Sequence, residues 1–126
     1  MSDQVIVRIP ASTPHVGLVR AAASALSALL NFTYERITDL HIAIDEACSR
    51  VMATADAAPS RIEVQFQVED DGLLISVTGD APVKPGAKVL NVWSETILMS
   101  LAEDVAVGER DGAALISFRL AREGAR

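Results

Sequence analysis

The sequence has little cysteine and few aromatic residues. Its 126 residues contain one cysteine, Cys48, and aromatic side chains make up only 4% of the chain. A single cysteine excludes an intramolecular disulfide framework and a metal ribbon built from Cys-x-x-Cys pairs. The N-terminus also lacks the basic and then apolar layout of a signal peptide. We therefore expect a protein of the reducing cytoplasm.

Basic residues are scarce as well, and no apolar run is long. Eleven Lys and Arg face 17 Asp and Glu, so the net charge is −6 and the isoelectric point about 4.8. Nucleic-acid binding depends on basic side chains that release counterions, so we expect no nucleic-acid partner. The longest apolar run, about Ala21 to Leu30, is too short to span a bilayer, so no membrane partner is expected. An acidic surface suits a basic protein partner and also promotes solubility.

The chain does have enough apolar content for a core. Half of its residues are hydrophobic, which excludes intrinsic disorder. A chain of this length forms one domain, residues 1–126, and buries roughly two thirds of the surface that it exposes when unfolded.

The first half predicts one strand and two helices. Val5, Val7 and Ile9 alternate in a strand that ends at Pro10. A helix from about Pro14 to Leu30 begins at the cap Thr13, and a second helix, capped by Thr33, reaches about Ala55. The residues expected to face the core are Leu18, Ala22, Ala25, Leu26 and Leu29 on the first helix, and Ile37, Leu40, Ile44, Ala47 and Val51 on the second.

The second half predicts four strands and one more helix. Strands over residues 62–68 and 73–77 flank a turn at Asp70–Gly72, and an irregular stretch follows over residues 79–90. Two last strands, near 105–109 and 115–120, are joined by a turn at Asp111-Gly112. The helix between, about residues 91–103, has an apolar stripe made of Trp93, Ile97, Leu98 and Leu101.

The order of these elements indicates an α+β fold. Strands that alternate apolar and polar residues have one covered face, and the three helices are the obvious cover. We predict a two-layer sandwich in which a mostly antiparallel sheet carries three helices on one face. The first strand is a natural sheet edge in this order.

One segment of the second helix, residues 39–50, resembles a known family. Its sequence, DLHIAIDEACSR, is similar to the Asp-Leu-x-x-Ala-x-x-Glu-Ala-x-x-Asn segment of the RsbW-type anti-sigma factors, a branch of the GHKL (Bergerat-fold) ATPases. Its Asp-Glu-x-Cys-Ser-Arg version looks like the actinobacterial members that control stress sigma factors. The matching positions are Asp39, Leu40, Ala43, Glu46 and Ala47, and Arg50 stands where the family has asparagine.

The resemblance implies a nucleotide site along this helix. ATP would lie against it, magnesium would be held through the asparagine, and Glu46 would be the general base toward a serine of an anti-anti-sigma partner. Arg50 departs from this pattern, because a guanidinium has five donors, no acceptor and a fixed positive charge. Glu46 and Arg50 are also spaced for a simple ion pair worth roughly 0.3–0.5 kcal/mol.

Two further elements of the family pattern are altered. The family's Asp-x-Gly-x-Gly turn reads adenine, but here Gly79 stands at the aspartate position. Asp80 substitutes for that aspartate only if the backbone shifts by one residue; otherwise it is an ordinary turn residue. The phosphate loop before the third helix keeps one glycine, Gly86, and its Lys84 and Lys88 either contact a phosphate or are solvated.

Three functional hypotheses follow from these observations. The first is an anti-sigma factor that binds a stress-type sigma factor directly, with a degenerate nucleotide site and no cofactor. The second is an active ATP- and magnesium-dependent serine/threonine kinase that phosphorylates a STAS anti-anti-sigma factor through Glu46. The third is a dimerisation module that pairs through its edge strand.

A few residues outside these motifs are also candidates for a functional role. Arg20 matches a basic position on the family's sigma-facing first helix, and an ordinary solvated arginine is the alternative. His15 and His41 have no partner at metal-ligand spacing, so no metal site is expected. Cys48 is expected to be a packed thiol and Trp93 a core residue.

Overall fold

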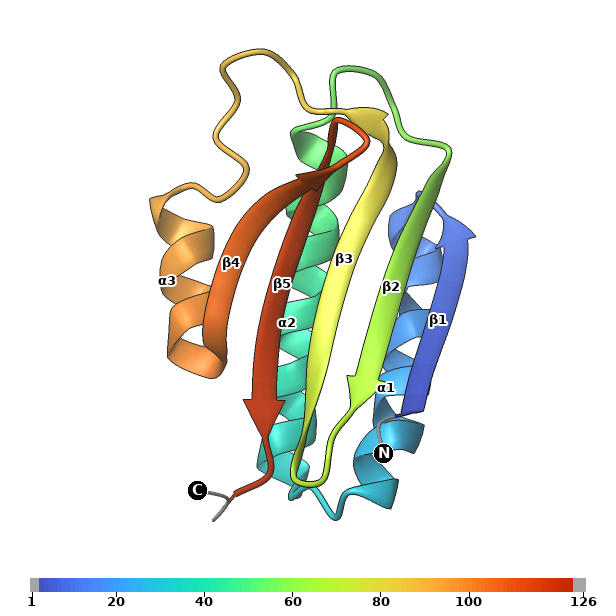
Figure 1. Ribbon diagram of the computed structural model, residues 1–126, viewed down its shortest axis with the longest axis vertical. Coiled ribbons are helices and arrows are strands. Elements are labelled where there is room, and N and C mark those ends of the chain that lie inside the picture. Colours follow the sequence, from blue (N-terminus) through green and yellow to red (C-terminus); the bar gives the residue numbers. More distant parts are fainter. Residues whose placement is uncertain (1–2, 124–126) are drawn as a thin grey trace.

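Five strands form one antiparallel sheet within residues 3–123, the part of the chain that the computed structural model describes (Figure 1). The order across the sheet is β1-β2-β3-β5-β4, and every neighbouring pair is antiparallel. The first strand is an edge, as predicted. The strands are β1 (Asp3–Pro10), β2 (Arg61–Val68), β3 (Gly72–Pro82), β4 (Glu103–Arg110) and β5 (Ala113–Ala121).

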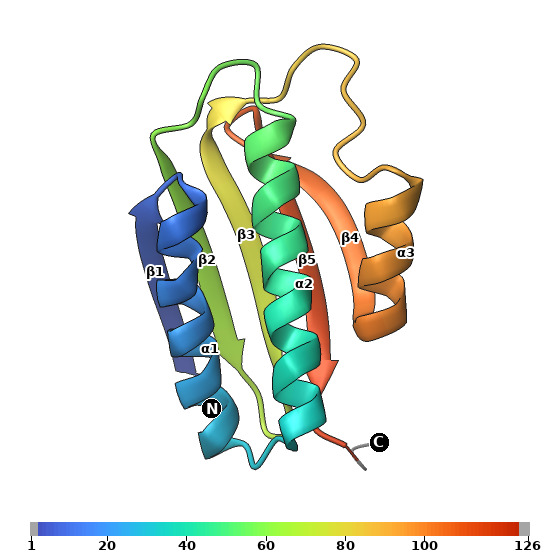
Figure 2. The same cartoon turned by 180° about the vertical axis from the view of Figure 1, so that it is seen from behind.

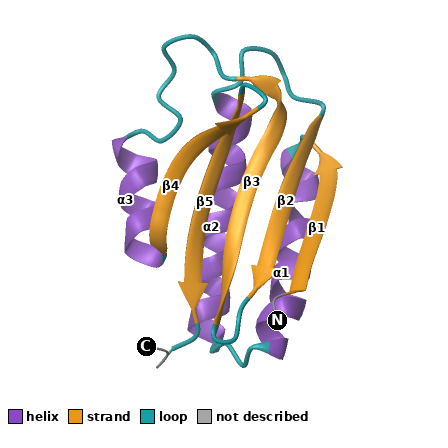
Figure 3. Cartoon of the chain, in the orientation of Figure 1, coloured by secondary structure: helices purple, strands orange, loops and turns teal. Residues whose placement is uncertain are grey.

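Three α-helices cover one face of this sheet. They are α1 (Val16–Leu29), α2 (Tyr34–Ala53) and α3 (Val92–Leu101), with α2 in the middle of the layer (Figure 2). In the part of the chain that the structure describes, no helix lies on the opposite face of the sheet (Figure 3). This arrangement confirms the predicted α+β sandwich. Within the described residues, no helix has the length and apolar content needed to cross a membrane.

Local sequence signals explain where the helices begin. The hydroxyl of Thr33 accepts a hydrogen bond from the Arg36 amide at 3.2 Å, which confirms the predicted cap of α2. The Asn91 side chain accepts one from the Ser94 amide at 2.8 Å and so caps α3. At the start of α1, a 3₁₀ turn over Thr13–His15 comes first, and Thr13 is not the cap of that helix.

The core lies between the sheet and the helices. It is built from alternate residues of β2, β3 and β5 and from one face of α2, as the periodicity of those segments predicts. The largest side chains that are completely buried are Phe66, Phe118, Leu40, Ile44, Ile62, Leu73, Ile75, Leu98, Ile116 and Leu120.

The predicted apolar face of α1 is wrong. Leu18, Ala25 and Leu29 are exposed, and Ala22 and Leu26 are only partly buried. The residues that face the core are Val16, Val19, Ala23 and Ser27. The physical reason is that apolar and small residues surround almost the whole helix, so the sequence offers two stripes and only packing against the sheet chooses between them.

Two expectations for the second half are also wrong. Trp93 is 72% exposed, because Ser94 and Leu98 are the buried residues of α3. The hydroxyl of Ser94 is paired with Asn91, so burying it costs little. Residues 79–82 are part of β3 and do not begin the irregular stretch, because the strand continues past a register shift to pair with β5 at Pro82.

Candidate functional site

Four of the predicted site residues lie on one side of α2. Asp39, Ala43, Glu46 and Arg50 follow each other at steps of four, three and four residues, which places them on one helix face. This side is the one nearest α3. Arg36, which pairs with Asp39 at 3.2 Å, also donates to the carbonyl of Leu101 at the end of α3. Ala43 is fully buried, whereas Glu46 and Arg50 are half-buried.

Arg50 binds the loop that precedes α3. Its Nε donates to the Val89 carbonyl at 2.8 Å, and a terminal guanidinium nitrogen donates to the Lys88 carbonyl at 2.9 Å. The same loop is held at its start, where the Lys84 amide donates to the Thr54 carbonyl just after α2. Loop 83–91 is therefore tied to the C-terminal end of α2, and it uses the main chain of Lys88 to do so.

The predicted ion pair between Glu46 and Arg50 is wrong. Among the described residues, no salt bridge joins them. The guanidinium turns to backbone carbonyls instead, which satisfies its donors and leaves the Glu46 carboxylate without an ionic partner in the described chain.

This donor set does not suit a magnesium ion. Mg²⁺ takes oxygen ligands at about 2.1 Å in octahedral geometry. At the position of the family's asparagine, Arg50 offers only N–H donors and a positive charge, and it uses the loop carbonyls Lys88 and Val89 as its own acceptors.

Gly79 and Asp80 point to opposite sides of β3. A Cβ built on Gly79 would lie 3.1 Å from Cγ1 of Val51, so this position faces α2 and is already filled by that helix. Asp80 instead accepts hydrogen bonds from the amide and hydroxyl of Ser60 at 2.9 and 2.8 Å. These bonds lower the pKa of the Asp80 carboxyl, and the bond from the Ser60 hydroxyl contributes most. Asp80 therefore lies in a strand, not in the turn that we expected, and it anchors the segment that enters β2.

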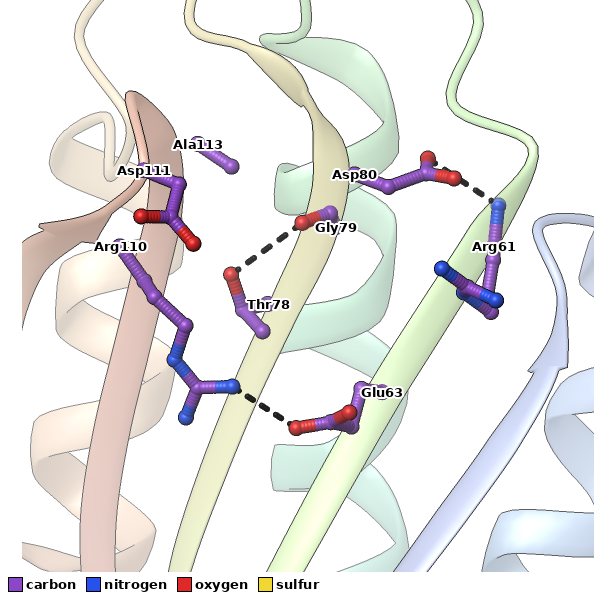
Figure 4. A pocket seen from close by; sticks show the side chains of 8 residues that line it. All are labelled: Arg61, Glu63, Thr78, Gly79, Asp80, Arg110, Asp111 and Ala113. Atoms are coloured by element: carbon purple, nitrogen blue, oxygen red, sulfur yellow. Dashed lines mark hydrogen bonds and ion pairs between the residues drawn. The ribbon is translucent and has the colours of Figure 1, made fainter.

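A pocket on the uncovered face of the sheet was not predicted (Figure 4). Its volume is about 280 Å³, and Arg61, Asp80 and Asp111 form part of its wall. Glu63, at its base, accepts hydrogen bonds from Arg110 and from Arg8 outside the pocket, both at 2.8 Å, and these bonds lower the pKa of its carboxyl. The sheet separates this pocket from the face of α2 that carries Glu46 and Arg50. The alternation of apolar and polar residues in β2 does not indicate which other strands bring charged side chains next to Glu63.

A second cavity, about 390 Å³, lies beside α1 and α2. Arg20 on α1 pairs with Asp45 on α2 at 2.6 Å in its wall, and Glu46 and Ser49 also line it. Arg20 thus has an ionic partner and is not simply solvated. Glu46 therefore belongs both to the face of α2 that carries Ala43 and Arg50 and to the wall of this cavity.

The remaining candidates are a cysteine and a histidine of α2. Cys48 is fully buried, and burial, reinforced by the charge of Asp45, raises its pKa to about 12, which confirms a packed thiol. His41 hydrogen-bonds Ser24 across the two helices at 2.8 Å. No group of three His, Cys, Asp or Glu side chains in residues 3–123 is arranged to hold a metal ion.

Several curated proteins are similar to this chain. Serine-protein kinase RsbW of Bacillus velezensis is 35% identical over 77 residues, which cover 60% of this chain and 48% of that protein. The proteins of the same name from Bacillus subtilis and Listeria monocytogenes are 28% and 30% identical, over 63% and 62% of this chain and 51% of each relative. The matches thus span about half the length of these relatives.

A solved structure shows the same fold. The crystal structure of the RsbU and RsbW domains of Rv1364c from Mycobacterium tuberculosis superposes with a TM-score of 0.73 at 15% identity. The superposition covers 95% of this chain and 32% of that one. The model of the family described as the histidine kinase-like ATPase domain matches residues 9–112, which is most of the fold described above. This chain belongs to the histidine kinase-like ATPase domain family.

Proposed function

We propose that this chain is an anti-sigma factor of the RsbW type that sequesters a stress-type sigma factor by direct contact and does not depend on bound nucleotide. The observation that carries the proposal is the pair of hydrogen bonds from Arg50 to the carbonyls of Lys88 and Val89. They occupy the place where a nucleotide-binding relative needs a metal-ligating amide.

The surroundings of Arg50 support the loss of nucleotide binding. The position of the adenine-reading aspartate is Gly79, and Val51 lies against it. The loop that would receive phosphates is tied to α2 by Arg50 and by Lys84. A phosphate group could still attract the guanidinium, but it would first have to displace two hydrogen bonds to the main chain.

The outer surface of α1 supports a protein partner. Leu18 and Leu29 are 59% and 77% exposed there, on a helix that also carries Arg20. Large exposed apolar side chains on one side of a helix are typical of protein interfaces, whereas Arg20 lies on the side that faces α2, where it pairs with Asp45. The net charge of −6 suits a partner with a basic surface, as DNA-binding proteins have.

A second candidate is a serine kinase that acts on a STAS-type anti-anti-sigma factor. The relatives are named serine-protein kinases, and Glu46 has no ionic partner in the described chain. In this candidate Glu46 would accept the proton of a serine hydroxyl. Because Glu46 lines the cavity beside α1 and α2, a bound partner could reach it from that side.

Two measurements separate the candidates. Calorimetric titration with the sigma factors of the same genome is expected to find one that binds more tightly than about 10 µM, roughly −7 kcal/mol. Thermal unfolding in millimolar ATP and magnesium is expected to show no shift, whereas saturation to about 100 times the Kd would add about 2.7 kcal/mol. A clear shift that Arg50→Asn enlarges and Arg61→Asn does not would favour the kinase. No sigma factor binding would refute the proposal.

A further inference from the structure

The outer side of α3 is uncharged and carries three large apolar side chains. Val92, Trp93 and Met99 are 76%, 72% and 63% exposed, and the exposed Thr96 and Ser100 lie between and beside them on the same side of the helix. On the inner side, Leu98 and Ser94 are completely buried. A helix on a protein surface normally turns charged and polar residues outward, so three large apolar side chains exposed on one short helix call for an explanation.

Nothing in the described chain covers this surface. α3 lies at one end of the helix layer, beyond α2 and on the far side from α1 (Figure 2). Its three large exposed side chains therefore form a patch of the kind that marks an interaction site, and tryptophan is the residue most enriched at interface hot spots.

Acidic residues border the patch along α3 and at its C-terminal end, whereas the exposed Lys88 lies in the loop before the helix. Residues 89–109 contain no lysine or arginine. Glu95 on α3 and Glu103 just after it are exposed and form no salt bridge within residues 3–123. The Asp104 side chain is 73% exposed, and its one ion pair within residues 3–123 is with Arg119 on β5. The border can therefore pair with cations that a partner supplies.

We propose that this surface, the α3 patch (Val92, Trp93, Thr96, Met99 and Ser100), docks an amphipathic helix of a protein partner whose apolar side is flanked by lysine or arginine. An apolar helix side would cover Trp93 and Met99, and the flanking cations would meet Glu95 and Glu103. A second copy would bring two acidic borders together, and an anionic membrane would be repelled by them. The patch is separate from the α1 surface and from Arg50, so the proposal does not depend on the function proposed above.

The single tryptophan makes the test direct. The probe is a labelled synthetic peptide of about 18 residues in which leucine and lysine alternate at helical spacing. We expect it to bind the full chain and to shift the emission of Trp93 to shorter wavelength as the indole leaves water. Peptide anisotropy then gives the Kd for variants. Trp93→Ser and Met99→Ser should each raise the Kd by about tenfold or more.

Matched variants separate this surface from general stickiness. Tyr34→Ser removes an aromatic side chain that is 84% exposed at the start of α2 and should change the Kd less than about twofold. The double variant Glu95→Gln, Glu103→Gln should weaken binding and reduce its dependence on salt between about 50 and 300 mM. Circular dichroism and thermal unfolding verify that each variant is folded.

Each other outcome overturns the proposal. No binding up to about 100 µM peptide would do so, and so would an equal loss with Tyr34→Ser. An emission shift that follows protein concentration without peptide would show that a second copy covers the patch. A shift with phosphatidylcholine–phosphatidylglycerol vesicles but not with peptide would show that a membrane covers it.

Discussion

Replacing Arg50 by alanine tests how loop 83–91 is held over α2. The substitution removes two charge-assisted hydrogen bonds, to the carbonyls of Val89 and Lys88, of which the first is partly buried and the second exposed. Such bonds contribute about 1.5–3 kcal/mol when buried and less when solvated. Arg50 also lies in the last turn of α2, where a cation contributes about 0.3–1 kcal/mol. We expect a loss of about 2 kcal/mol in the free energy of unfolding, or roughly 6–10 °C in Tm.

Hydrogen exchange shows whether the loss is local. The amides of Lys84 and Ala87 donate to the Thr54 and Lys84 carbonyls, so both are protected only while the loop is in place. In Arg50→Ala they should exchange faster than global unfolding explains, while amides of β2, β3 and β5 follow the change in global stability. The matched control is Arg61→Ala, since Arg61 is exposed and forms no salt bridge within residues 3–123.

A single result would refute this account of Arg50. If Arg50→Ala and Arg61→Ala had the same free energy of unfolding and the same exchange rate at the Lys84 and Ala87 amides, Arg50 would not hold the loop. The proposal that this chain does not depend on bound nucleotide would then lose the observation that carries it.

Three further predictions concern stability. In Gly72→Ala the new Cβ would lie 2.6 Å from a backbone carbonyl oxygen of β5, so thermal melts should show a loss of about 1–3 kcal/mol in the free energy of unfolding. Gly108→Ala is the control, because a Cβ there meets open space and should cost no stability. Two arginines lower the pKa of Glu63 below its usual 4.5, so the carboxylate stabilises the fold at neutral pH and this stabilisation is lost as the pH falls below that value. Urea unfolding should therefore show that Glu63→Gln loses less stability than the native chain between neutral and acidic pH. Thr33→Ala should cost about 1 kcal/mol by denaturant titration, through loss of the α2 cap.

Periodicity predicted the elements whose two sides differ in polarity. β2 alternates without exception, and its apolar residues Ile62, Val64 and Phe66 are completely buried. The same logic placed the buried face of α2 and the cap Thr33 correctly. It failed for α1 and, at Trp93, for α3, because apolar residues occur on more than one side of each helix and the period then does not choose between the sides.

The candidate site divides in a similar way. The spacing of Asp39, Ala43, Glu46 and Arg50 along one helix fixes their common face, because a helix repeats every 3.6 residues. The sequence could not predict what Arg50 binds, since its hydrogen-bond acceptors lie 38 and 39 residues further along the chain. The pocket around Glu63 was missed for the same reason: Arg8 and Arg110 come from strands far away in sequence.

By itself, then, the amino-acid sequence determined the kinds of element, their order and the helix that carries the family segment, because these depend on neighbours within a few residues. The tertiary structure alone decided that Arg50 binds the loop and not Glu46, that Gly79 and Asp80 face opposite sides of β3, and that Trp93 faces outward. Those outcomes depend on which distant groups the packing of the sheet against the helices brings within hydrogen-bond distance, and on which side of each helix it leaves uncovered.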